Sequence, residues 1–97
     1  MLVLIAKYHV KPGNVASVLT ELKKMKPLVE NNEPGCKLYQ VSLSSENDEL
    51  IVLYEQYDDE AALQYHRETP HFKAIIEETI VPKLLKRERE RYELVIP

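Results

Sequence analysis

Residues that build several common functional sites are scarce in this chain of 97 residues. Its one cysteine, Cys36, excludes an internal disulfide framework and every metal site made of several thiolates. Its two glycines, Gly13 and Gly35, lie far apart, so neither a P-loop nor the glycine-rich fingerprint of a dinucleotide-binding fold can form. A single thiol also fits a reducing compartment, and we therefore expect a cytoplasmic protein.

Long apolar runs and an excess of positive charge are also absent. No apolar segment approaches the roughly 20 residues that cross a bilayer, and residues 1–10 lack the basic leader of a signal peptide, so we expect no membrane association. The formal net charge of −3 provides no overall positive field, so we do not expect nucleic acid as a partner. The composition, with 44% hydrophobic and 30% charged residues, indicates one globular domain over residues 1–97.

The hydrophobic pattern predicts the element order β-α-β-β-α-β. Apolar residues at helical spacing predict one helix from Val15, which Pro27 bends or ends, and another over residues 60–68. A cap residue followed by proline, Thr69-Pro70, predicts a new helical start, so the second helix is broken. Runs of branched and aromatic residues predict strands over residues 2–10, 36–44, 49–57 and 92–96, with the charged run 86–91 leading into the last one.

This order is typical of the ferredoxin-like sandwich, an α+β fold in which one antiparallel four-stranded sheet has helices on one face. We expect the strand order 4-1-3-2, because the first and third predicted strands are the most apolar. Both faces of those two strands are apolar, although helices cover only one. At roughly 25 cal/mol per Å2, a wet outer face would cost many kcal/mol, which favours a homodimer packed sheet against sheet as a dimeric α+β barrel. The alternative is a small twisted sheet with imperfect patterning.

The segment 65–72 contains two of the three histidines and is the candidate site. His66 shares the inward stripe of its predicted helix with Leu63, while Glu55 and Tyr57 share one face of the third strand. If that face meets the helix, these polar side chains converge, and a carboxylate aimed at an imidazole forms a proton-transfer pair. The alternative is a buried polar pair that satisfies only itself, which composition alone favours.

The other candidate side chains are expected around this pair. His71 is expected at the surface or at the rim of the site, and Tyr39 and Tyr65 are expected as aromatic residues of the core or of a pocket. His66 and His71 lie five residues apart across the helix break, a poor spacing for holding one ion. Because no pair of thiolates is present either, we predict no metal site.

Four segments of the chain, taken together, resemble the antibiotic biosynthesis monooxygenase family over essentially its whole length. They are Lys11-Pro12-Gly13, Glu33-Pro34-Gly35-Cys36, Tyr54-Glu55-Gln56-Tyr57 and residues 61–66 followed by Thr69-Pro70-His71-Phe72. The chain is most similar to the small bacterial branch that includes quinol monooxygenases and the isomerase of a phosphorylated autoinducer. The resemblance implies a dimer that exchanges a C-terminal segment, residues 92–96, and a pocket between sheet and helices in each subunit.

The resemblance also implies oxidation of a small quinol or phenol by O2 with no cofactor. In that case His66 is the catalytic base and Glu55 orients it, while Tyr57, Tyr39, Tyr65 and His71 contact the substrate. The chain has no tryptophan, which the haem-degrading branch uses, so haem degradation is excluded.

Two alternative functions stay open at this point. One is an acid–base isomerase of a small oxygenated metabolite, and the other is a non-catalytic dimeric ligand-binding module. An isomerase of a phosphorylated substrate would need cations at the pocket. The nearby candidates in the sequence are Lys7, Arg67 and Lys73, and none of them is convincing.

Overall fold

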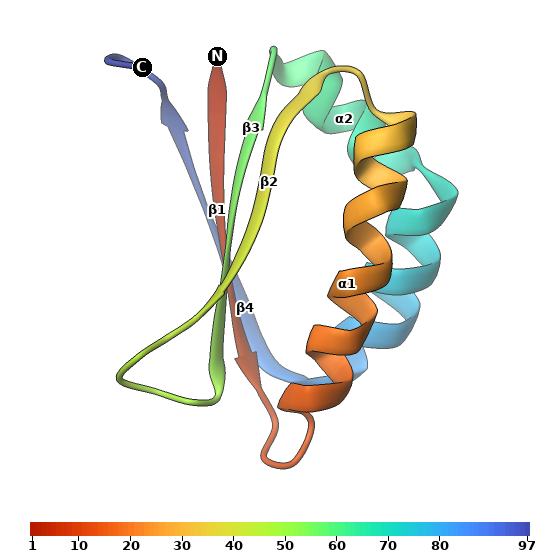
Figure 1. The fold of residues 1–97 in the computed structure, drawn as a ribbon, viewed down its shortest axis with the longest axis vertical. Coiled ribbons are helices and arrows are strands. Elements are labelled where there is room, and N and C mark those ends of the chain that lie inside the picture. The colour runs from red at the N-terminus through yellow and green to blue at the C-terminus, as the bar shows by residue number, and fades with distance from the viewer.

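A four-stranded antiparallel sheet carries all the helices on one face (Figure 1) in the computed structural model, which describes residues 1–97. The strands are β1 (Leu2–Val10), β2 (Cys36–Leu43), β3 (Leu50–Tyr57) and β4 (Leu84–Glu93). The helices are α1 (Val15–Asn32), α2 (Glu60–Glu68), the π-helical segment η1 (Phe72–Ile80) and the 3-10 turn η2 (Val81–Lys83). The strand order is β2-β3-β1-β4, so the predicted ferredoxin-like fold and its strand order are confirmed.

The core lies between the helices and the inward face of the two central strands. Alternate residues of β1 and β3 point toward the helices, which explains their alternating burial. The buried apolar side chains of this layer come from both strands, from α1 and from η1. They include Ala6, Tyr8, Val10, Ile51, Leu53, Val18, Leu22, Met25, Val29, Phe72, Ile76 and Ile80.

Pro27 lies inside α1 without ending it. A proline removes one backbone hydrogen bond and crowds the preceding turn, so either a bend or an end was open from the sequence. Met25 and Val29, on either side of it, are both buried against the sheet. Packing of this apolar face therefore holds the helix together as far as Asn32.

The prediction of the last strand was wrong in its position. β4 begins at Leu84, not at Tyr92, and the charged run 86–91 is the strand itself. β4 is an edge strand paired only with β1, so backbone pairing rather than an apolar sequence defines it. Charged side chains are common on edge strands, where they discourage further pairing.

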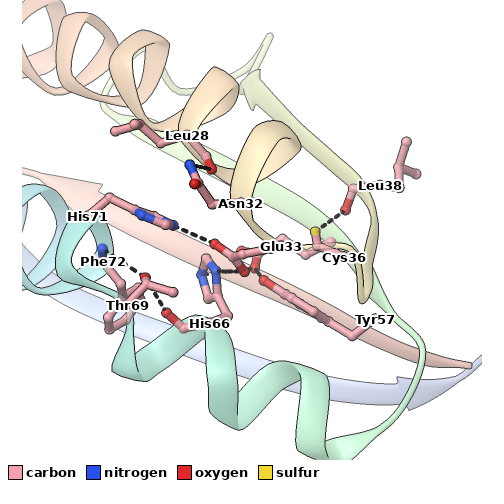
Figure 2. Close-up of polar contacts among 11 residues, drawn as sticks. Leu28, Asn32, Glu33, Cys36, Leu38, Tyr57, His66, Thr69, His71 and Phe72 are labelled. Carbon is pink, nitrogen blue, oxygen red and sulfur yellow. Dashed lines mark hydrogen bonds and ion pairs between the residues drawn. The ribbon is translucent and has the colours of Figure 1, made fainter.

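The break after α2 is held by one hydroxyl group. Thr69 is buried, and its Oγ1 donates a hydrogen bond to the carbonyl of His66 at 2.7 Å. The same oxygen accepts from the backbone N–H of Phe72 at 3.2 Å (Figure 2). One side chain therefore satisfies a backbone carbonyl at the end of α2 and a backbone N–H at the start of the next helical segment.

Candidate active site

His66 lies between two buried carboxylates. Its Nδ1 is 2.7 Å from Oε1 of Glu33, and its Nε2 is 3.8 Å from Oε1 of Glu55. His66 and Glu33 are each 2% exposed, and Glu55 is 3% exposed. A buried imidazole with a carboxylate on each side is an arrangement that can hold and move a proton.

Glu33 bridges two histidines (Figure 2). Its second oxygen, Oε2, is 2.6 Å from Nε2 of His71, whose side chain is almost buried. Burial of Glu33 by itself acts to raise the pKa of this carboxyl, but the hydrogen bonds from His66 and His71 outweigh it and hold the pKa below its usual range. Glu33 is therefore an ionised acceptor at neutral pH.

The charge of Glu33 determines which nitrogen of His66 carries the proton. An ionised carboxylate can only accept hydrogen bonds, so His66 must donate through Nδ1–H and His71 through Nε2–H. In neutral His66 the other nitrogen, Nε2, then has a free lone pair. That lone pair faces Glu55, on the side of the ring away from Glu33.

A close packing contact places Glu33. The residue caps the end of α1, where its backbone N–H donates to the carbonyl of Val29 at 3.0 Å. Two residues later the chain passes against α2 at Gly35, where an added Cβ would lie 2.6 Å from the Cβ of Ala62. Only glycine fits there without a shift of one backbone, so Gly35 brings the Glu33 carboxylate next to His66.

Glu55 has a second partner on its own strand. It lies two residues before Tyr57 on β3, so both side chains point to the helices, and the Tyr57 hydroxyl donates to Oε1 of Glu55 at 2.5 Å. Burial raises the pKa of Glu55, while His66 and Tyr57 act against this change. Burial and the Glu55 charge also raise the pKa of Tyr57, so Tyr57 stays a neutral donor. Glu55 therefore takes up a proton more readily than an exposed glutamate.

A small cavity lies beside His66 and Glu55. Its volume is about 20 Å3, enough for one water molecule. The ring of His66 packs edge-on to Phe72 at a centroid distance of 5.0 Å and lies 5.9 Å from Tyr39. The cavity is lined by apolar, aromatic and cationic side chains as well as the two proton-holding groups. These lining residues are Leu4, Ala6, Tyr8, Tyr39, Glu55, Leu63, His66, Arg67, Phe72, Arg87 and Arg89.

The structure brings together the three polar residues that the sequence placed on facing surfaces, Glu55, Tyr57 and His66. Of the other predicted substrate contacts, Tyr39 lines the cavity. Tyr65 does not, since it is 53% exposed and lines a surface hollow beside Cys36 and Ala62. The predicted contacts of these residues with substrate stay predictions.

His71 differs from its predicted surroundings. It was expected at a rim, but its side chain is almost buried against Glu33 and does not line the cavity. Sequence reasoning missed Glu33 itself, which it interpreted as part of a turn. The signal was present: Glu33 lies four residues after Val29, on the buried stripe of α1.

Neither a metal cluster nor a reactive thiol accompanies this site. No group of three or more His, Cys, Asp or Glu side chains is arranged to hold a metal ion. Burial, together with the charges of Glu55 and Glu33, raises the pKa of Cys36 to about 12, so the thiol stays protonated. None of the helices combines the length and the apolar character that a bilayer crossing needs.

Comparison with known proteins agrees with the fold. A family model described as antibiotic biosynthesis monooxygenase matches residues 1–78, which contain Glu33, Glu55, His66 and His71. The "Probable quinol monooxygenase YgiN" of Escherichia coli strain K12 is 36% identical over 87 residues, covering 79% of this chain and 83% of that protein.

Solved structures give the same result. A conserved protein from Methanosarcina mazei Go1 is 30% identical with a TM-score of 0.86, covering 94% of this chain and 89% of that one. The protein PA3566 from Pseudomonas aeruginosa is 25% identical with a TM-score of 0.88, covering 98% and 94%. The match of the family model over most of the chain, together with these relatives, shows that this chain belongs to the antibiotic biosynthesis monooxygenase family.

Proposed function

We propose that this protein oxidises a small electron-rich phenol or quinol with O2, without a cofactor, and that His66 is the catalytic base. The observation that carries the proposal is the position of the His66 imidazole. Its Nδ1–H is held by Glu33, which leaves Nε2 free on the side of Glu55. Membership of the family and the curated quinol monooxygenase relative support the reaction class.

The proposed first step is a proton transfer. A substrate hydroxyl next to Nε2 of His66 gives up its proton, and the imidazolium that forms is stabilised by the ionised Glu33 on its other nitrogen. The resulting phenolate is electron-rich and can pass an electron directly to O2. The apolar and aromatic walls, which include Leu63 and Phe72, exclude water from the reactive anion.

Oxygen uptake tests this function directly. A quinol is mixed with the protein without oxygen, oxygen is then admitted, and its consumption is followed with an electrode. We expect uptake clearly faster than in the protein-free control, because deprotonation at His66 makes the reductant. Uptake no faster than in the control would contradict the proposal and would leave the acid–base isomerase and the non-catalytic ligand-binding module as candidates.

One feature of the site favours a second candidate, an acid–base isomerase. Glu55 has a raised pKa and lies 3.8 Å from His66, so the two groups can respectively donate and accept a proton at neighbouring substrate atoms. Product analysis of the oxygen-free mixture separates the candidates, because an isomerase converts its substrate without consuming oxygen.

We also propose that two copies pack through the outer face of the sheet, which carries no helix (Figure 1). The central strands place Ile5, Val52 and Tyr54 on this face, and all three are only half-buried. Near the C-terminus, Val95 and Ile96 are 82% and 85% exposed. Burying this apolar surface against a second copy removes it from water. The C-terminal segment that contains Val95 and Ile96 can contact the same second copy.

Sedimentation equilibrium tests the proposed dimer. We expect a species of twice 11.3 kDa, and we expect Val52→Lys to shift it toward monomer because a charge would be buried at the contact. Leu28→Lys, a similar change on the exposed side of α1, is expected to leave the dimer intact. A wild-type protein that is a folded monomer throughout would contradict the proposal.

A further inference from the structure

Three arginines lie at the exposed side of the cavity that contains His66. Arg67 follows His66 on α2, and Arg87 and Arg89 come from β4. In the register of the sheet, Arg87 pairs with Tyr8 and Arg89 with Ala6, so both arginines are on the face that meets the helices. Arg67 and Arg87 are half-buried and Arg89 is exposed, whereas His66 is buried behind them.

None of these three arginines has a carboxylate partner. The ion pairs of the chain include Arg91 with Glu60 at 2.7 Å, but none involves Arg67, Arg87 or Arg89. Arg91 is on the same strand and the same face, so its pairing shows that β4 can recruit an acidic partner from the helices.

The sequence of β4 separates the charges of opposite sign. Because alternate residues point to opposite faces, Glu88 and Glu90 lie on the outer face, where they contact His9 and Lys7. Arg87, Arg89 and Arg91 alternate with these glutamates and face inward. All three arginines line one small cavity, and partial burial together with the nearby charges of Arg87 and Arg67 lowers the pKa of Arg89.

Like charges without an ion-pair partner repel one another, and Glu55, the one carboxylate that lines the cavity, offsets this repulsion only in part through Arg67. An anion placed among the three guanidinium groups would remove the repulsion and form charge-assisted hydrogen bonds in a forked geometry. The cavity that they line is also lined by His66, the candidate base. A ligand whose anionic group binds the three arginines therefore has its remaining atoms close to the candidate base, His66.

We propose that Arg67, Arg87 and Arg89 bind an oxyanion group of the substrate, a carboxylate or a phosphate, and so direct its hydroxyl toward His66. The role given to the substrate hydroxyl rests on the proposed function. The binding of an anion by the arginines does not depend on it. Of the three cations considered from the sequence, Arg67 lines the cavity, whereas Lys7 lies on the outer face with Glu90 and Lys73 does not line the cavity. The cavity of about 20 Å3 must widen for a substrate, and long arginine side chains at its exposed side can move without disturbing the core.

Binding without oxygen tests the inference apart from turnover. Titration calorimetry under nitrogen, at constant ionic strength, compares 1,4-dihydroxybenzene with 2,5-dihydroxybenzoate and with 4-hydroxyphenyl phosphate. We expect at least one of the anionic compounds to bind about tenfold or more tightly than the uncharged quinol. Whichever anion shows the larger preference identifies the group as carboxylate or phosphate.

Variants then test whether the three arginines cause the preference for anionic compounds. The double variant Arg87→Gln/Arg89→Gln is expected to bind the charged and uncharged compounds with nearly equal affinity, and Arg89→Gln alone to lose part of the preference. The matched control is Arg91→Gln, which removes an arginine of the same strand that is already paired with Glu60 and is expected to keep the preference. Circular dichroism checks that each variant is folded. If the double variant does not fold, the single variant Arg89→Gln is the test, because Arg89 is exposed.

Three results would overturn the inference. They are equal binding of all three compounds by the wild-type protein, a preference that survives the double variant, and a preference lost equally in Arg91→Gln. The monooxygenase function fails separately. If anions bind selectively but oxygen uptake is not accelerated, the arginine site stands and the proposed reaction is wrong.

Discussion

Replacing His66 by alanine is expected to lower kcat/KM for quinol oxidation by about 100-fold to 10,000-fold, the usual contribution of a positioned general base. The reason is that the substrate hydroxyl loses its assigned proton acceptor, Nε2 of His66, which Glu33 leaves free on the side of Glu55. Glu55 is the nearest alternative, and it is already the acceptor of the Tyr57 hydroxyl. The measurement is initial oxygen uptake at several quinol concentrations and several pH values.

Two comparisons separate a base from a packing residue. His71 binds the same carboxylate but does not line the cavity, so His71→Asn is expected to lower kcat/KM by less than His66→Ala does. Imidazole added to His66→Ala should restore part of the rate, because it can occupy the space left by the ring. A His66→Ala protein that is folded and retains wild-type activity at every pH would refute the assignment.

Replacing Glu33 by glutamine is expected to lower the free energy of unfolding by about 3 kcal/mol, because a buried charged acceptor shared by two histidines is lost. A glutamine amide offers one oxygen, while its nitrogen faces the second histidine N–H and cannot accept from it. Urea unfolding at pH 7, followed by circular dichroism, gives this value. Activity should fall as well, because His66 loses the group that fixes its Nδ1–H.

The pH dependence of the Glu33 effect has a definite sign. The pKa of Glu33 is lower in the folded protein than its ordinary value of 4.5, so the carboxylate stabilises the fold fully above that ordinary value. This stabilisation disappears as the pH falls through the lowered pKa. The difference in stability between wild type and Glu33→Gln should therefore be large at pH 7 and should shrink below about pH 4.5.

A surface carboxylate of the same helix is the control for Glu33. Glu30 is exposed and 3.6 Å from Lys26, and Glu30→Gln is expected to change stability by no more than about 0.5 kcal/mol. If Glu33→Gln were as stable as Glu30→Gln at pH 7, the bridging carboxylate would have no structural role. The description of how His66 is held would then be wrong.

The spacing of apolar residues was sufficient to predict an element wherever its buried side chains recur at regular intervals. The alternating apolar residues of the first strand predict β1 as it is observed, and the helix over residues 60–68 coincides with α2. β4 could not be located in this way. Its inward side chains are arginines rather than apolar residues, and its place depends on backbone pairing with β1, which is more than 70 residues away in sequence.

The site was predictable only in part, because some of its contacts join residues that are far apart in the sequence. Glu55 and Tyr57 are two residues apart on one strand, and the strand period alone places them together. Glu33 meets His66 and His71 across separations of 33 and 38 residues, so its role depends on tertiary packing around Gly35. Of the three arginines only Arg67 was considered from the sequence; Arg87 and Arg89 were missed because their strand was interpreted as a charged connection.

The protonation state of the His66 ring tests the central claim most directly. Two-dimensional 1H–15N NMR correlating ring nitrogens with ring protons distinguishes the two neutral forms of histidine, and His66→Gln assigns the signal. At the high-pH end of the titration we expect the proton on Nδ1, where Glu33 accepts it, and a bare Nε2 facing Glu55. We expect Glu33→Gln to weaken this preference. A wild-type His66 with its proton on Nε2 would contradict the account, because the nitrogen assigned to accept the substrate proton would already be occupied.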